Sequence, residues 1–241
     1  FRDFFKDSDA KESISIQEIV EIPKNLIDAL LKSKDINFYV NYEVDPKIYV
    51  TTVISKLSQV MLNIYKNAID QIVLKNIEDK NAPLTIAEVG VGSGIISIML
   101  AKFLPNARFI AVDISKDALA IAQKNIQKFE LLHKIKLREG SLLEPVTEHI
   151  DYLVSNPPYI ATAAPLESNL SYEPQNALFG GEEGDEIIKE LLDELLKREI
   201  NFFSCEMGYD QKDKIRNYLK ETPIKSLSFY EDYSGFDRGF T

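Results

Sequence analysis

The spacing of hydrophobic side chains changes near residue 80 of the chain. Before that point, in segments 16–33 and 51–76, apolar residues recur every three or four positions, which predicts amphipathic helices. Between these segments, residues 36–44 alternate between apolar and polar positions and predict a strand or one arm of a hairpin. We therefore expect residues 1–80 to form a small helical region with a possible hairpin linker.

After Pro83, strand-like runs alternate with helical ones. The expected strands are 84–89, 108–112, 135–138, 150–154, 201–206 and 225–231. The expected helices are 93–103, 115–129, 184–197 and 210–220. Strands and helices in alternation are typical of a mostly parallel sheet that is covered on both faces. Residues 81–241 should therefore form one doubly wound α/β domain.

Composition limits the function classes. The formal net charge is −10, which argues against broad binding of a nucleic-acid backbone. A local basic patch remains open at Lys124, Lys128, Lys134, Lys136 and Arg138, although a solvated helix face explains these residues better. No apolar run reaches the roughly 18 residues that span a bilayer, so no membrane partner is expected. The single cysteine, Cys205, excludes an intrachain disulfide and suits a reducing cytoplasm.

A glycine-rich turn follows the first strand of the α/β region. The run 84–89 leads into Gly90-Val91-Gly92-Ser93-Gly94 and then into a helix. Glycines at a strand-to-helix turn permit positive φ and let the backbone approach a ligand closely. The spacing G-x-G-x-G differs from the dinucleotide pattern G-x-G-x-x-G, and the turn alone could be only a tight turn.

An acid follows the second strand. Asp113 comes directly after the run 109–112, at the sheet edge where open α/β sheets bind ligands. Its carboxylate has acceptors for both hydroxyls of a ribose. Alternatively, Asp113 could cap the helix that starts near Ser115. Taken with the glycine turn, it predicts a cofactor that contains a nucleoside.

Glu88, just before the glycines, narrows the choice of cofactor. A carboxylate there would repel a pyrophosphate but could hold an ammonium group indirectly or through water. S-adenosylmethionine has an amino-acid end and a positive sulfonium and lacks phosphate. It is therefore favoured over NAD, with S-adenosylhomocysteine as the product and no metal.

The stretch Ser-Asn-Pro-Pro-Tyr-Ile at 155–160 ends the fourth strand abruptly. Asn156 and the next carbonyl can grip both hydrogens of a planar NH2 group, and Tyr159 offers a face for stacking. The proline pair would hold both residues rigidly. A strand-ending turn without function is the alternative. His133 and His149 lie in loop-like surroundings and are not expected to take part in catalysis.

At this point the chain resembles a known family. "EVGVGSG" (88–94), "AVDIS" (111–115) and "NPPY" (156–159) are similar to the motifs of class I adenosylmethionine-dependent methyltransferases that act on planar exocyclic nitrogen. Two branches share NPPY: adenine-N6 nucleic-acid methyltransferases and protein glutamine-N5 methyltransferases of peptide chain release factors. Three further stretches resemble the second branch: "YEPQNALFGGEEG" (172–184), "EMGYDQ" (206–211) and "DYSGFDR" (232–238).

The resemblance implies a Rossmann-like, seven-stranded sheet, a helical N-terminal domain for substrate recognition, and a monomer. It implies methyl transfer to the glutamine of a Gly-Gly-Gln loop in a class I release factor. The implied cofactor residues are Glu88, Gly90, Gly92, Gly94, Asp113, Ile114, Ser141, Leu142 and Asn156. The residues that would hold the glutamine amide are Asn156, Pro157, Pro158 and Tyr159.

The sequence also departs from the family. The family usually has a Pro-Arg-Pro-x-Thr-Glu stretch before the catalytic domain, and the corresponding residues 44–59 of this chain lack it. Two alternatives therefore stay open: an adenine-N6 nucleic-acid methyltransferase, and a relative that binds adenosylmethionine without catalysis. The chain begins at Phe1 and not at Met, and it stops at Thr241, where a last edge strand would begin. We expect both ends to be incomplete.

Overall fold

The computed structural model describes residues 12–15, 49–52, 77–165, 174–231 and 235–241. The chain divides into two compact units, residues 1–74 and 75–241. In the first unit, β1 (Glu12–Ser15) and β2 (Tyr49–Thr52) pair antiparallel. Residues 51 and 52, which we expected to begin a helix, lie in β2. The remainder of that helix, the helix over 16–33 and the strand over 36–44 lie outside the described residues.

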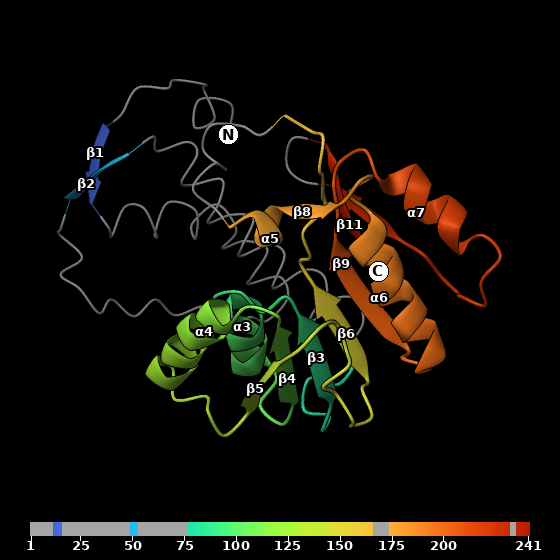
Figure 1. The fold of residues 1–241 in the computed structure, drawn as a ribbon. Helices are drawn as coiled ribbons and strands as arrows, with labels where there is room; N and C mark the ends of the chain where they lie inside the picture. Colours follow the sequence, from blue (N-terminus) through green and yellow to red (C-terminus); the bar gives the residue numbers. More distant parts are fainter. Residues whose placement is uncertain (1–11, 16–48, 53–76, 166–173, 232–234) are drawn as a thin grey trace. The chain divides into compact units, whose positions relative to one another are not determined.

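The second unit contains a seven-stranded sheet in the order β10-β11-β9-β6-β3-β4-β5 (Figure 1). Its strands are β3 (Thr85–Val89), β4 (Arg108–Asp113), β5 (Ile135–Glu139), β6 (Tyr152–Ser155), β9 (Phe202–Glu206), β10 (Phe229–Glu231) and β11 (Asp237–Phe240). The pairs from β5 to β9 are parallel, and only β11 and β10 run antiparallel to their neighbours. The predicted doubly wound, mostly parallel sheet is confirmed.

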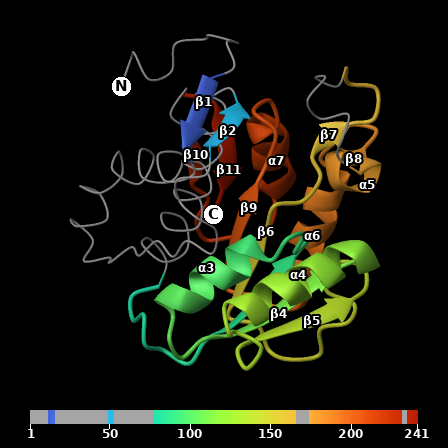
Figure 2. The same ribbon diagram turned by 90° about the vertical axis from the view of Figure 1, so that its left-hand side faces the viewer.

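Helices cover both faces of this sheet (Figure 2). They are α3 (Ile95–Phe103), α4 (Lys116–Lys128), α6 (Glu186–Lys197) and α7 (Lys212–Leu219). The central strands β3, β4 and β6 are buried along nearly their whole length, as expected for parallel strands that are covered on both faces. Successive side chains of β3 point to opposite faces: Ala87 and Val89 join the cluster under α6, while Glu88 bonds to Ser97 of α3.

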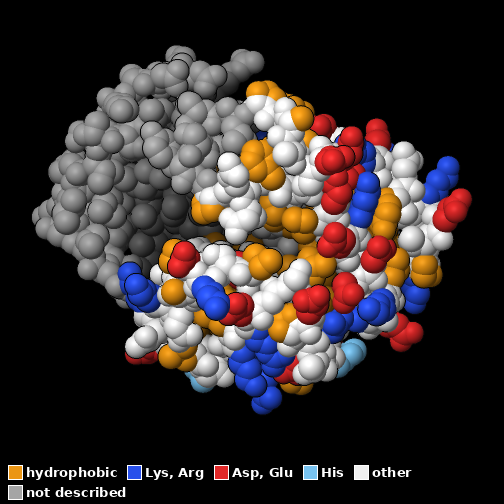
Figure 3. Space-filling view, viewed as in Figure 1, with side chains coloured by type: hydrophobic (Ala, Val, Ile, Leu, Met, Phe, Trp, Pro, Cys, Tyr) orange, Lys and Arg blue, Asp and Glu red, His pale blue; other side chains and the backbone are white. Residues whose placement is uncertain are grey.

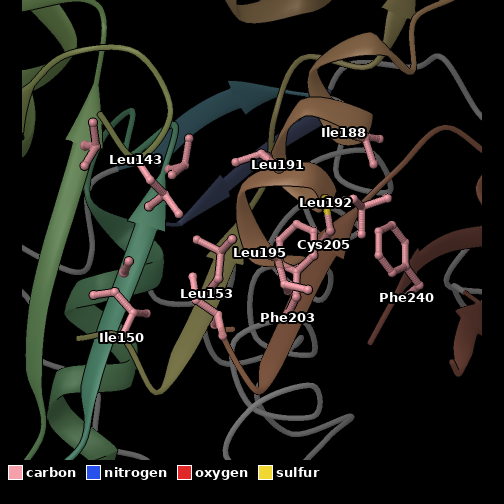
Figure 4. Close-up of a cluster of buried hydrophobic side chains, with 14 of the residues drawn as sticks. Leu143, Ile150, Leu153, Ile188, Leu191, Leu192, Leu195, Phe203, Cys205 and Phe240 are labelled. Carbon is pink, nitrogen blue, oxygen red and sulfur yellow. The ribbon is translucent and has the colours of Figure 1, made fainter. Parts of the chain in front are cut away.

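A cluster of buried apolar side chains lies beneath α6. Four buried side chains recur along α6 at helical spacing and form one stripe. Figure 4 shows this stripe against the sheet: Ile188, Leu191, Leu192 and Leu195 face Leu153 of β6 and Phe203 and Cys205 of β9. Each fully buried side chain of this kind contributes roughly 1.5–3 kcal/mol. This packing fixes α6 on the sheet and so supports the loops at the sheet edge.

In the second unit, three short elements and one strand were not predicted. β7 (Ile160–Ala161), α5 (Gln175–Leu178) and β8 (Phe179–Gly181) follow the NPPY turn, and β7 pairs parallel with β8. The fourth is β11, which lies between β9 and β10. The expectation that a last strand would only begin at Thr241 was therefore wrong. Among the helices that the structure describes, none is long and apolar enough to cross a membrane.

Candidate functional site

The register of three parallel strands brings their carboxyl ends to one level. Val89, the last residue of β3, lies beside Val112 of β4 and Ser155 of β6. The Ser155 hydroxyl also donates a hydrogen bond to the Val89 carbonyl (2.8 Å), which fixes β6 against β3 at this end. β3 connects to β4 on one side while β6 lies on the other, so this is a topological switch point of the sheet. The residues that follow directly at this edge are Gly90, Asp113 and Asn156.

The glycine turn places its backbone in conformations that other residues rarely adopt. Gly92 has φ of 52° and Gly94, the N-cap of α3, has φ of 82°. The Gly90 and Val91 N–H groups both donate to the Val112 carbonyl (2.9 and 3.0 Å). The turn is thus anchored on the neighbouring strand while it crosses the sheet edge, which is how a backbone can approach a ligand closely.

The Asp113 carboxylate organises this edge. Its Oδ2 accepts from the Gly92 N–H (2.9 Å), and its Oδ1 accepts from the Ser115 N–H (2.9 Å). The side chain that caps α4 is Ser115, whose hydroxyl accepts from the Ala118 N–H (3.2 Å). The capping role considered for Asp113 therefore falls to Ser115. A carboxylate has about four lone-pair positions, so Asp113 can still accept from a ligand.

Glu88 is a buried carboxyl with one oxygen engaged. Its Oε2 accepts from both the N–H and the hydroxyl of Ser97, while its Oε1 has no hydrogen-bond partner among the described residues. Burial raises the pKa of Glu88 to about 8; the bonds from Ser97 oppose this rise, and the charge of Asp113 adds to it. At neutral pH the group therefore holds a proton in the ligand-free protein.

Glu88 should make the ligand-free protein less stable as pH rises from about 4.5 to 8. Above 4.5 the unfolded chain releases this proton, while the folded protein keeps it until about 8, so folding binds a proton throughout this window. A difference of 1 between the pKa values of Glu88 in the folded and the unfolded protein changes the free energy of unfolding by about 1.4 kcal/mol. A loss of that size would lower the melting temperature by roughly 3–5 °C for a domain of this size. Melting curves at pH 5, 6.5 and 8 should show a smaller decline in Glu88→Gln.

The control for this measurement is Glu221→Gln, which removes an exposed carboxylate. It should follow the wild-type pH dependence. If Glu88→Gln and the wild type declined in parallel between pH 5 and 8, Glu88 would not be the buried proton carrier.

A cavity of about 590 Å³ opens at this sheet edge. That volume is within the usual range for a small-molecule site. Figure 3 shows apolar side chains around the hollowed region and acidic side chains beside it. Among the described residues that line it, the titratable side chains are all acids: Glu88, Asp113 and Glu190. The cavity therefore favours a ligand with positive charge and disfavours phosphates.

Most of the predicted site residues line this one cavity. They are Glu88, Gly90, Gly92, Asp113, Ile114, Ser141, Leu142, Asn156, Pro157 and Pro158. Two predicted residues are outside the lining: Gly94, which packs against Ala122 of α4, and Tyr159. The two histidines, His133 and His149, are also outside it.

Part of the lining was not predicted residue by residue. Pro174, Asn176 and Ala177, in and before α5, contribute one wall, and Ile187 and Glu190 of α6 contribute another. The first three lie in the stretch 172–184 that carried the resemblance. The two α6 residues are three positions apart and so share one helix face, a signal that becomes useful only once the helix has been placed over the sheet.

Tyr159 makes contacts that the sequence did not indicate. Its ring packs against the core cluster beneath α6, and its hydroxyl donates to Oε1 of Glu206 (3.1 Å). The ring is only partly buried, so part of it remains accessible. Tyr159 thus has a packing role that sequence reasoning did not foresee, beside the predicted role in stacking.

The NPPY turn is packed against β8, which contains Gly180. A Cβ added at Gly180 would collide with the carbonyl oxygens of Pro158 and Gly184. The Thr162 N–H donates to the Gly181 carbonyl (2.8 Å) and continues this contact. Two stretches that are distant in sequence therefore meet backbone to backbone, which explains the paired glycines of "ALFGG" in physical terms.

The comparisons with known proteins agree with this geometry. Residues 67–172 match the family model of the methyltransferase small domain. A release factor glutamine methyltransferase of Moorella thermoacetica is 38% identical over 162 residues, which are 65% of this chain and 57% of that protein. One of Enterococcus faecalis is 36% identical over 166 residues, 66% of this chain and 59% of that protein. The chain thus spans less than two thirds of the length of these relatives.

A solved structure is similar at the level of the fold. The N-terminal domain of human METTL16, determined in complex with SAH, has a TM-score of 0.50 and 16% sequence identity, and the match covers 92% of this chain and 80% of that one. The seven-stranded sheet, the cavity at its switch point and the sequence relatives are all consistent with a methyltransferase fold. This chain matches the methyltransferase small domain over residues 67–172, and over about two thirds of its length it is similar to release factor glutamine methyltransferases.

Proposed function

We propose that this protein transfers a methyl group from S-adenosylmethionine to the side-chain amide nitrogen (N5) of a glutamine in another protein. The observation that carries this proposal is the position of Asn156 and Pro157, which line the same cavity as the glycine turn and Asp113. A group held at the NPPY turn would therefore be next to a ligand held at the turn and the acid. The relatives at 36–38% identity support this choice of acceptor.

The cavity fits adenosylmethionine by its charges and its donors. The titratable side chains that the structure describes in the lining are all acids, which suits a ligand with a sulfonium and an ammonium group and no phosphate. Asp113, which already orients the Gly92 N–H, has acceptors left for a ribose diol. The unpartnered Oε1 of Glu88 is available to the amino-acid end, and Ser141 and Leu142 provide a wall for the adenine. When bound, adenosylmethionine would supply a methyl group on positively charged sulfur.

The NPPY turn would hold the acceptor amide. The side-chain oxygen of Asn156 and the carbonyl oxygen of Pro157 can each accept one hydrogen of a planar NH2 group. Because the amide nitrogen is conjugated and a poor nucleophile, alignment and hydrogen bonds that strengthen during transfer should provide most of the acceleration. No buried nucleophile is required by this arrangement.

The acceptor protein that we propose is a peptide chain release factor, modified on the glutamine of its Gly-Gly-Gln loop. The support is the function named for the relatives, together with the acidic balance of the chain, which disfavours a nucleic-acid acceptor. The test uses purified protein and labelled adenosylmethionine with three acceptors: a release factor, the same factor with Gly-Gly-Gln changed to Gly-Gly-Glu, and DNA and RNA oligonucleotides.

Transfer to the first acceptor only is the expected result. Transfer to an oligonucleotide with none to the release factor would establish an adenine methyltransferase instead. No transfer to any acceptor, with the cofactor still bound, would identify a binding protein without catalysis.

Asp113→Ala should weaken binding of S-adenosylhomocysteine at least about tenfold, because two hydrogen bonds to a charged acceptor are lost and each is worth roughly 1.5–3 kcal/mol. Isothermal titration calorimetry measures this directly. The matched control is Asp117→Ala, an exposed acid in the first turn of α4, which should leave the affinity unchanged.

Equal affinities in the wild type and Asp113→Ala would remove Asp113 from the ribose role. Tight binding of NAD in place of S-adenosylhomocysteine would overturn the class of cofactor. A melting curve for each variant separates lost binding from lost folding.

A further inference from the structure

Tyr159 is held at two points by residues that come from β9 and the loop after it. Its hydroxyl donates to Oε1 of Glu206 (3.1 Å), and its backbone carbonyl accepts from Nε2 of Gln211 (2.9 Å). Gln211 is itself fixed, because its Oε1 accepts from the Gly208 N–H (2.8 Å) and its side chain is only 2% exposed. The stretch "EMGYDQ" thus supplies a two-point support for the NPPY turn.

The C-terminal strands β10 and β11 pack beside Glu206. In the ladder, Gly239 of β11 is opposite Glu206 of β9 and opposite Tyr230 of β10. The Tyr230 side chain crosses directly over Gly239, where a Cβ would collide with its ring and hydroxyl. Burial raises the pKa of Tyr230 well above its usual value, and the next largest cause is the charge of Glu206. Tyr230 is therefore a close neighbour of this carboxylate.

The NPPY turn needs such support because it has few means of its own. Pro157 and Pro158 have no N–H to donate, so this part of the turn cannot be fixed by the usual backbone ladder. The hydrogen bond from the Tyr159 hydroxyl to Oε1 of Glu206, 3.1 Å long, restricts the rotation of the ring. Glu206 thus constrains the ring of Tyr159 at its hydroxyl, and Gln211 constrains the backbone of Tyr159 at its carbonyl.

We propose that Glu206 and Gln211 are positioning residues for methyl transfer, acting through Tyr159 on the orientation of the Asn156–Tyr159 turn. This role rests on the proposed function, since it concerns the turn that would hold the acceptor amide. Neither residue lines the cofactor cavity. The two residues should therefore affect turnover and leave cofactor affinity unchanged.

The first test is kinetic. Glu206→Ala should lower kcat by about tenfold to 10²-fold, since small misplacements of reacting groups have effects of this size. Glu206→Gln, which keeps an acceptor oxygen for the Tyr159 hydroxyl, should restore most of the rate. Tyr159→Phe removes the same hydrogen bond from its other end, so the double variant with Glu206→Ala should be no slower than the slower single variant. The dissociation constant for S-adenosylhomocysteine should stay within about twofold of wild type in each variant.

The chain offers a matched control. The Tyr218 hydroxyl donates to Oδ1 of Asp193 (2.7 Å), a second tyrosine–carboxylate pair, which joins α7 to α6 outside the cavity lining. Asp193→Ala and Tyr218→Phe should leave kcat unchanged. Equal losses in the two sets of variants would mean that the effect of Glu206 is only general destabilisation, and would overturn the proposal.

A second readout does not depend on the acceptor. Hydrogen exchange followed by mass spectrometry should show faster exchange of the amides of residues 159–162 in Glu206→Ala and in Gln211→Ala, with no change in residues 90–97. Unchanged exchange at 159–162 in both variants would overturn the positioning role, even where kcat had fallen. If the wild-type protein methylated no release factor, the exchange experiment would still decide whether these residues fix the turn, while the proposed acceptor alone would fail.

Discussion

Replacing Asn156 with alanine should lower the rate of methyl transfer by about 10²–10³, the usual effect of removing one preorganised group that stabilises a transition state. The Asn156 side chain lies in an exposed position at the carboxyl edge of the sheet, next to the buried Pro157. Its oxygen would accept a hydrogen bond that strengthens as the amide nitrogen rehybridises. Because the residue is exposed, the free energy of unfolding should change by only about 0.5 kcal/mol. Single-turnover transfer to a release factor, with a melting curve, measures both.

Two further variants sharpen this test. Asn156→Asp keeps an acceptor oxygen at the same place and should be faster than Asn156→Ala. Asn217→Ala removes an exposed amide from α7, away from the cavity, and should behave as wild type. A wild-type rate in Asn156→Ala would refute the role of Asn156 in holding the acceptor.

Gly180→Ala should destabilise the domain by about 3 kcal/mol, at the upper end of what overpacking usually does. The new methyl group would meet the carbonyl oxygens of Pro158 and Gly184, and backbone atoms cannot rotate away as a side chain can. For a domain of this size the melting temperature should fall by roughly 6–12 °C. Since the displaced backbone belongs to the NPPY turn, the rate of transfer should fall even at temperatures where the variant is fully folded.

The control separates crowding from backbone strain. Gly235 has a φ of +81° but a Cβ there would meet no described atom within 4 Å, so Gly235→Ala should cost only about 1 kcal/mol. A Gly180→Ala variant that was no less stable than Gly235→Ala would show that the NPPY turn and β8 can separate without loss of stability.

The edge of the sheet that carries the site could be predicted from sequence for a simple reason. Strand–helix alternation implies parallel strands, and parallel strands have their carboxyl ends on the same side. Gly90, Asp113 and Asn156 each follow a strand-like run directly, so their common location requires no knowledge of register. The common direction of the parallel strands is enough to place these three residues at the same edge of the sheet.

The contacts of the NPPY turn could not be predicted in this way. Tyr159 and Glu206 are 47 positions apart, and their hydrogen bond leaves no periodic trace in the sequence. β7 and β8 have two and three residues, too few for an alternating pattern to be detected. The burial of Glu88 likewise depends on α3, which covers it from above the sheet. The alternative that Asp113 caps the next helix is wrong, because Ser115, two positions later, is the N-cap of α4.

The position of β11 has a consequence for the way the protein is made. Domains generally begin to fold from the N-terminal side during synthesis. β9 is complete at residue 206, but the strand that covers its open edge ends only at Phe240, and β10, although made earlier, pairs with β11 and not with β9. Until that late segment has left the ribosome, the nascent chain carries an unpaired strand edge, a template for pairing with other chains. Ribosome-bound chains that stop before residue 237 should therefore remain dependent on a chaperone, and release of the last strand should complete the sheet.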